Sequence, residues 1–348
     1  MLYHENMVQP RLYPPSTVHG SDDAPPLLVT TQEAAWICQV HASTVKRWCD
    51  AGQLSCRLTG GGHRRILLGD LVEFARGEGI VTALREFGPE LDKVWLASAQ
   101  AANGRFDALV DCWFRWLMAE DALLLTPSLS LLLDRGLDLA LVLDQGVARL
   151  MRRVGAAWEE GRIRIGDEHR ASEHIVDALH GLRARLTNRP RATNGPQRAI
   201  VGAAEGDPHH LGAFMVRLIL EARGLAVSYL GANVPGEEFA VQQRRWSADL
   251  VCASFSASRA PADAVRLVRG LAQVYEPEQP YHLVLGGAAV GDRTIAFPHR
   301  PFRSFAILGS LAELAALLDD WSEDGATATR SDVEAAEAFP AAMTLDGV

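Results

Sequence analysis

An acid, two adjacent histidines and a glycine follow directly on an apolar run in RAIVGAAEGDPHHLG, residues 198–212. Imidazole is the most common metal ligand among side chains, and a carboxylate on its second nitrogen fixes its orientation and raises its basicity. Asp207 stands two residues before His209, which suits that supporting role, and Gly212 has no Cβ to obstruct a bulky ligand. His210 is the rival ligand by adjacency. The spacing indicates a ligand site where a strand ends.

Two further strand-like runs end in small residues. Ser254 and Ser256 end DLVCASFS, and Gly286 and Gly287 end YHLVLGG. Helical patterns separate the strand-like runs over residues 211–223, 236–246, 261–276 and 310–321. This alternation predicts a Rossmann-like, doubly wound parallel sheet, in which ligands bind at the carboxyl ends of the strands. The first strand lacks a following G-x-G-x-x-G, which argues against a dinucleotide site.

The order D-x-H-x-x-G, S-x-S and G-G resembles the cobalamin-binding domains of methionine synthase and related proteins. Ser256 stands where that family usually has Leu or Thr. In the family, the histidine replaces the cofactor's own benzimidazole on cobalt, and the nucleotide tail passes the glycines. The resemblance implies His209 as the metal ligand. It implies a cofactor site made of Asp207, His209, Gly212, Ser254, Ser256, Gly286 and Gly287.

Several segments with helical periodicity lie between residues 91 and 186 and predict a helix bundle. One of them carries an apolar stripe of Leu143, Val147, Leu150, Met151, Val154 and Trp158. Glu168 and His169 follow Trp158 at a W-x9-E-H spacing. A tryptophan on such a stripe is more often a core residue, and a Glu-His pair is more often solvated.

Upstream of a cobalamin motif, however, W-x9-E-H resembles the CarH-type photoreceptor regulators. That resemblance implies adenosylcobalamin, with the bundle as a cap over the upper cobalt face. Trp158 would shield the adenosyl group, Glu168 would hydrogen-bond to it, and His169 would belong to the same site. Family members commonly have a histidine directly after the tryptophan, and here Glu159 takes its place. A carboxylate is a poorer cobalt ligand than imidazole, so the lit-state ligand stays open.

A basic patch lies near the N-terminus of a chain whose net charge is −9. A capping box of Thr30 and Glu33 predicts a first helix, STVKRW a second, and GGGHRR a hairpin wing. The predicted DNA-binding residues are Ser43, Thr44, Lys46, Arg47, His63, Arg64 and Arg65. The pattern resembles the MerR/excisionase class of winged helix-turn-helix domains. The alternative is a solvated basic face on a structural unit.

These observations predict a multidomain α and α/β protein. Its parts are a disordered tail (1–27), a MerR/excisionase-like winged helix-turn-helix (28–80), a helix-bundle cap (90–188), a Rossmann-like cobalamin domain (197–322) and an acidic disordered tail (323–348). The chain has no apolar run long enough to span a membrane and no signal-peptide pattern. Its five cysteines are odd in number and form no C-x-x-C pair, which favours reduced thiols in a cytoplasm.

Together, the resemblances imply a light-responsive transcription regulator and not an enzyme. It would bind operator DNA as a dimer or tetramer and would change assembly when light removes the adenosyl group. A cobalamin sensor without light response is the first alternative, and Glu159 keeps it open. A corrinoid carrier for methyl transfer is the second. A bilin as an additional chromophore also stays open.

Overall fold

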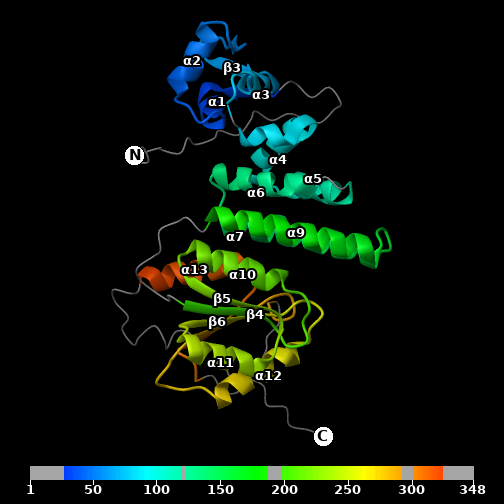
Figure 1. The fold of residues 1–348 in the computed structure, drawn as a ribbon, viewed down its shortest axis with the longest axis vertical. Coiled ribbons are helices and arrows are strands. Elements are labelled where there is room, and N and C mark those ends of the chain that lie inside the picture. The colour runs from blue at the N-terminus through cyan, green and yellow to red at the C-terminus, as the bar shows by residue number, and fades with distance from the viewer. Residues whose placement is uncertain (1–26, 81, 120–121, 187–197, 292–300, 324–348) are drawn as a thin grey trace. The chain divides into compact units, whose positions relative to one another are not determined.

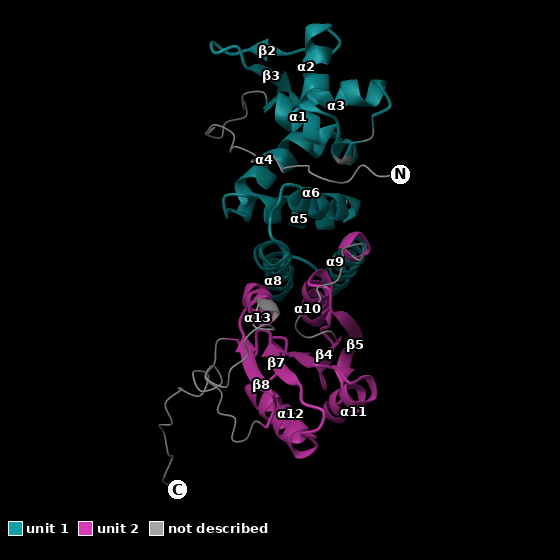
Figure 2. Ribbon diagram, turned by 90° about the vertical axis from the view of Figure 1, so that its left-hand side faces the viewer, with its two compact units in different colours: residues 1–182 teal, residues 183–348 magenta. Residues whose placement is uncertain are grey.

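The computed structural model describes residues 27–80, 82–119, 122–186, 198–291 and 301–323. It divides into two compact units, residues 1–182 and 183–348, coloured separately in Figure 2. The predicted tails 1–27 and 323–348, apart from Leu27 and Glu323, and the predicted linker 187–197 lie outside the described residues. No helix of the described residues is long and apolar enough to cross a membrane.

The first unit begins with a helix-turn-helix and a hairpin (Figure 1). Its elements are β1 (Leu28–Thr30), α1 (Thr31–Ile37), α2 (Ala42–Asp50), β2 (Arg57–Leu58), β3 (Arg64–Leu67) and α3 (Leu68–Gly77). The predicted capping box is present, since Thr30 Oγ1 accepts from the Glu33 N–H at 3.1 Å and the Glu33 carboxylate accepts from the Thr30 N–H at 2.7 Å. β3 pairs antiparallel with both β1 and β2, which ties the hairpin to the start of the domain.

A set of helices follows, as the sequence predicts, and its last member, α9, runs four residues past the end of the first unit. They are η1 (Ala83–Glu90), α4 (Leu91–Ala101), α5 (Asp107–Met118), η2 (Ala122–Leu124), α6 (Leu125–Asp134), α7 (Leu139–Leu141), η3 (Val142–Val147), α8 (Ala148–Glu159) and α9 (Ile165–Leu186). Trp113 of α5 is fully buried, and its indole N–H donates to Ser128 Oγ of α6 at 2.8 Å. A Cβ on Gly146 would come within 2.8 Å of that ring. Close approach to Trp113 thus explains a glycine inside a helix.

The predicted apolar stripe is only partly a core. Leu143, Val147, Leu150 and Val154 are buried, whereas Met151 is half-buried. Trp158 at the end of α8 keeps 44% of its surface exposed. The core interpretation of Trp158 is therefore wrong, because the stripe turns out of the packed interior before the helix ends.

The second unit is the predicted doubly wound sheet. Its elements are β4 (Arg198–Ala204), α10 (Leu211–Ala222), β5 (Ala226–Val234), α11 (Gly236–Trp246), β6 (Leu250–Ser254), α12 (Pro261–Gln273), β7 (His282–Gly286), β8 (Ser304–Leu308) and α13 (Leu311–Glu323). All strand pairs are parallel, in the order β5-β4-β6-β7-β8. α10 and α13 cover one face and α11 and α12 the other (Figure 1). The chain changes direction between β4 and β6, so the carboxyl ends of these two strands form the expected ligand crevice.

Candidate functional site

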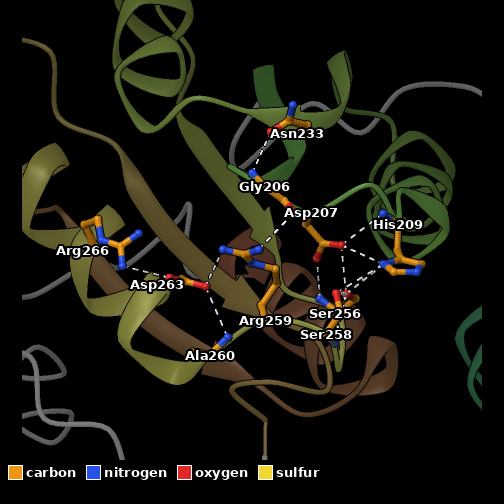
Figure 3. Close-up of polar contacts among 10 residues, drawn as sticks. All are labelled: Gly206, Asp207, His209, Asn233, Ser256, Ser258, Arg259, Ala260, Asp263 and Arg266. Atoms are coloured by element: carbon orange, nitrogen blue, oxygen red, sulfur yellow. Dashed lines mark hydrogen bonds and ion pairs between the residues drawn. The ribbon is translucent and has the colours of Figure 1, made fainter.

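The turn after β4 holds a buried carboxylate at this crevice. Asp207 is 0% exposed and binds groups from two strand ends (Figure 3). Its Oδ1 accepts from the His209 backbone N–H at 3.0 Å and lies 3.0 Å from His209 Nδ1. Its Oδ2 accepts from the Ser256 N–H at 2.7 Å, and the Ser256 hydroxyl donates to Oδ1 at 2.9 Å. One carboxylate thus ties the turn after β4 to the residues that follow β6.

The His209 imidazole is directed by this carboxylate, and most of its side chain is exposed. Its side chain is 62% exposed, and Nδ1 faces Asp207. With a proton on Nδ1, Nε2 keeps a lone pair for a metal. The adjacent His210 contributes its backbone carbonyl to the Tyr229 hydroxyl at 3.2 Å. The carboxylate contact favours His209 over His210 as the ligand.

Ser258 was missed by the sequence prediction. Its hydroxyl lies 2.8 Å from Ser256 Oγ and 3.4 Å from His209 Nδ1. The only available signal was a third serine in SFSAS, two residues beyond the motif. Asp207, Ser256 and Ser258 therefore surround the same imidazole nitrogen.

Arg259 supports the turn from below and was also not predicted. Its Nη1 donates to the Gly206 carbonyl at 3.0 Å, and its Nη2 pairs with Asp263 at 2.6 Å. On the other side, the Gly206 N–H donates to Asn233 Oδ1 at 2.6 Å. These contacts fix the backbone directly before Asp207 (Figure 3).

The motif glycines make close contacts within the protein itself. A Cβ on Gly212 would lie 2.8 Å from Ser254 Oγ, so these two predicted site residues lie side by side. Gly287 has φ +106°, and a Cβ there would lie 2.2 Å from the Phe255 carbonyl oxygen. A Cβ on Gly286 would lie 3.2 Å from the Leu308 carbonyl oxygen. Gly212 thus lets α10 begin close to the end of β6, and its expected role in leaving room for the ligand stays a prediction.

The predicted cap residues lie around the turn from α8 to α9. Glu168, in the first turn of α9, accepts from the Ser172 hydroxyl at 2.9 Å and lies 3.5 Å from His169 Nε2. His169 is 72% exposed, and Trp158 is also exposed. These three residues belong to residues 1–182 and His209 to residues 183–348. A joint site made from both groups stays a prediction.

The predicted DNA-binding residues fall on α2 and the β2–β3 hairpin. Lys46 and Arg47 are exposed, and Ser43 and His63 are exposed as well. Thr44 is half-buried. The residues of α2 are held by a histidine cap, since His41 Nδ1 accepts from the Ser43 N–H at 3.3 Å and lies 2.7 Å from Ser43 Oγ.

The wing arginines are less free than the sequence suggests. Arg64 pairs with Asp50 at the end of α2, and Arg65 Nη1 donates to the Arg64 carbonyl at 3.2 Å. The sequence prediction missed Asp50 as a partner because fourteen residues separate it from Arg64.

Trp48 of α2 packs on Phe74 of α3, with ring centroids 5.0 Å apart, and this contact holds α2 against the rest of the domain.

Comparison with known families matches three segments of the chain. Residues 28–79 match a helix-turn-helix domain, and residues 124–181 and 197–294 each match a B12 binding domain. A corrinoid protein of Desulfitobacterium hafniense is 28% identical over 122 residues, which are 35% of this chain and 56% of that protein. Dimethylamine corrinoid protein 2 of Methanosarcina acetivorans is 25% identical over 112 residues, 32% of this chain and 50% of that protein.

The chain spans about half the length of these two relatives. Among solved structures, the monomethylamine corrinoid protein of Methanosarcina barkeri has a TM-score of 0.46 at 20% identity, over 59% of this chain and 93% of that one. The family matches give the chain the architecture of a cobalamin-binding, DNA-binding regulator: a helix-turn-helix domain followed by B12-binding segments.

Proposed function

We propose that the chain is a light-responsive transcription regulator that binds adenosylcobalamin through His209 and is not an enzyme. The observation that carries the cobalamin site is the single exposed imidazole backed by the buried Asp207 carboxylate. The described residues contain no group of three or more His, Cys, Asp or Glu side chains that could hold a metal ion. A lone imidazole such as His209 would suit a metal whose other ligands come from a cofactor, as those of cobalt do in a corrin ring.

The residues around the turn would orient that donor. Asp207 would accept a hydrogen bond from a proton-bearing Nδ1 of His209, and the Ser256 and Ser258 hydroxyls lie beside the same nitrogen. Such a supporting carboxylate raises the basicity of the ligating nitrogen and fixes the ring. Adenosylcobalamin, when bound, supplies a cobalt–carbon bond that light breaks. The role of the protein would be to keep the His209 imidazole fixed, through Asp207, while that bond breaks.

The upper side of the site would come from the first unit. The exposed Trp158 offers an apolar surface for the adenosyl group, and Glu168 offers a hydrogen-bond acceptor. Losing the adenosyl group would remove both contacts. We expect this to weaken the oligomer interface that the helix bundle supports, so that a local change dissociates the oligomer. Glu159 offers no imidazole, so we expect the lit state to keep one histidine ligand unless His169 rearranges.

The DNA-binding half of the proposal rests on the exposed Lys46 and Arg47 of α2 and on the hairpin. α2 would enter the major groove, while the wing meets phosphate. One such domain buries little surface on DNA, so a dimer or tetramer is needed for useful affinity. The site of action would be the cytoplasm.

The second candidate function is a corrinoid methyl carrier, favoured by the names of the relatives. The helix-turn-helix segment argues against it, because a carrier for methyl transfer needs no DNA reader. Transfer of a methyl group from bound methylcobalamin to a thiol would support the carrier. The third candidate is a regulator that senses cobalamin without light. It differs from the proposed regulator only in that illumination does not change its assembly or its DNA binding.

Two matched variants test the ligand assignment. We expect His209→Ala to lose the lower-ligand spectrum of bound adenosylcobalamin, leaving the cofactor base-on or unbound. His210→Ala should retain the wild-type spectrum, since its side chain is not the one oriented by Asp207. Near-native spectra for both variants, or loss only in His210→Ala, would show that the assignment is wrong.

A further inference from the structure

The backbone of Gly206 is bound from two sides by side chains that lie outside the D-x-H-x-x-G, S-x-S and G-G motifs (Figure 3). Its N–H donates to Asn233 Oδ1 at 2.6 Å, and its carbonyl accepts from Arg259 Nη1 at 3.0 Å. The two partners are 27 and 53 residues away along the chain. Gly206 directly precedes Asp207, so both contacts act on the backbone that carries the buried carboxylate.

The register of the sheet places Asn233 beside this turn. β5 pairs with β4 so that Val234 lies opposite Ala204, the last residue of β4. The Asn233 N–H donates to the Asp207 carbonyl at 2.9 Å. Its φ is +51°, a left-handed conformation that asparagine adopts more readily than most residues. Asn233 therefore binds the turn twice, once through its side chain and once through its backbone.

Arg259 is anchored in the segment that follows β6. Its backbone N–H donates to the Ser256 carbonyl at 3.0 Å, and its Nη2 pairs with Asp263 at 2.6 Å. Only 23% of the side chain is exposed. Gly206 has φ +74°, and a Cβ there would lie 2.9 Å from Arg259 Nη1, so the guanidinium occupies the space that any other residue at this position would need. Arg259 thus joins the turn after β4 to the end of the neighbouring strand.

The Asp207 carboxylate can direct His209 only while its own backbone stays in place. Its two oxygens serve the His209 N–H, the Ser256 N–H and the Ser256 hydroxyl at 2.7–3.0 Å, and Oδ1 also faces His209 Nδ1. Hydrogen bonds of this kind weaken steeply as distance and angle depart from their optimum. A small movement of the backbone before Asp207 would therefore disturb several of these contacts together.

We propose that Asn233 and Arg259 are positioning residues for the lower cobalt ligand. By fixing the backbone of Gly206, they set the place of the Asp207 carboxylate and, through it, the direction of the His209 imidazole. The part of this role that concerns cobalt rests on the proposed function. The fixing of the turn does not, and it is tested separately.

The first test measures hydrogen exchange of backbone amides in the full-length protein without cofactor. Arg259→Met removes the donor to Gly206 and keeps most of the side-chain stem. We expect faster exchange at the His209 and Ser256 N–H groups, because both donate to Asp207. The amides within β6 should exchange as in wild type, since the sheet itself is not altered.

Three further variants serve as controls. Arg266→Met removes a guanidinium that pairs with the same Asp263 at 3.0 Å but is 71% exposed, and it should leave both amides unchanged. Asn233→Gly fits φ +51° and lacks the acceptor, so it should behave like Arg259→Met. Asn233→Asp keeps an acceptor oxygen and should behave like wild type. These two variants separate the hydrogen bond from the unusual backbone conformation.

The second test is a dark titration of the same proteins with adenosylcobalamin, followed by absorption. We expect Arg259→Met and Asn233→Gly each to bind about 3–10-fold more weakly than wild type, because the net effect of one hydrogen bond is modest. The fraction of bound cobalt without a histidine ligand should rise in both. Arg266→Met and Asn233→Asp should keep the wild-type affinity and spectrum.

Wild-type exchange at the His209 and Ser256 amides in both Arg259→Met and Asn233→Gly would overturn the proposal. Faster exchange throughout β6 would overturn it as well, since it would show general destabilisation. Faster exchange at the two amides with unchanged affinity and spectrum would refute the role toward cobalt. A wild-type protein that binds no adenosylcobalamin would instead refute the proposed function, and the exchange measurement would still decide whether the two side chains fix the turn.

Discussion

Replacing Asp207 by asparagine would remove the charge that orients His209 while keeping the size of the side chain. The carboxylate accepts from the backbone N–H groups of His209 and Ser256, from the Ser256 hydroxyl and, in the proposed tautomer, from His209 Nδ1. The asparagine amide has only one acceptor oxygen, and its NH2 group, itself a donor, would face one of these N–H or O–H donors. At least one buried N–H then has no acceptor.

The expected cost follows from that count. A buried donor left without a partner costs about 1–3 kcal/mol, so the free energy of unfolding should fall by about that amount. Loss of a carboxylate that supports a ligating histidine typically weakens metal affinity by about 10–100-fold. We therefore expect Asp207→Asn to bind adenosylcobalamin about 10–100-fold more weakly than wild type, with a larger base-on fraction.

The assay is a dark titration with adenosylcobalamin followed by absorption, with thermal unfolding of the cofactor-free protein measured alongside. Asp263→Asn is the matched control, since Asp263 pairs with Arg259 and Arg266 in the same region but not with His209. It should lower stability without changing the ligand spectrum. Wild-type affinity and spectrum in Asp207→Asn would refute the reasoning.

Three further predictions follow from other parts of the structure. Gly287→Ala should unfold or strongly destabilise the second unit, because Gly287 has φ +106° and an added Cβ would lie 2.2 Å from the Phe255 carbonyl oxygen. Gly60→Ala is the control and should melt near the wild-type temperature, since nothing lies within 4 Å of its added Cβ. Equal melting temperatures for the two variants would contradict this prediction. Lys46→Ala should lower the slope of log DNA affinity against log salt concentration by about one. Arg64→Ala should lower this slope by less, because Arg64 already pairs with Asp50. Equal slopes for the two variants would show that the Arg64–Asp50 ion pair opens when DNA binds. Burial, aided by Arg303, lowers the pKa of His282 from 6.5 to about 4, so its stabilising effect is complete above pH 6.5 and is lost as pH falls toward 4. His282→Gln should remove up to about 3 kcal/mol of acid-dependent destabilisation in urea titrations, and an unchanged pH profile would contradict the assignment.

The parallel sheet and its ligand-bearing edge could be predicted because buried strands and polar strand ends leave direct marks in the sequence. The run RAIVGAA forms β4, and Asp207 and His209 follow it at the expected end of the sheet. The capping box of Thr30 and Glu33 is equally local, since its partners are three residues apart. Such local patterns predicted the helices of the second unit close to their observed bounds.

Contacts between distant segments could not be predicted in this way. Arg259 contacts Gly206 from fifty-three residues away, and Arg64 of β3 pairs with Asp50 at the end of α2. The space beside Gly212 is filled by Ser254 only because α10 packs on β6. The outward turn of Trp158 likewise depends on where the bundle packing ends. Periodicity alone does not contain this information.

The light response, the central claim of the proposed function, is tested most directly by size-exclusion chromatography of the adenosylcobalamin-loaded protein in the dark and after green light, with absorption recorded on the same sample. We predict that illumination dissociates the dark oligomer and yields a spectrum of cobalt with one histidine ligand, because Glu159 replaces the histidine that follows the tryptophan in the CarH-type regulators. An oligomer that stays unchanged after complete photolysis would contradict the light response and make the protein a light-independent cobalamin sensor.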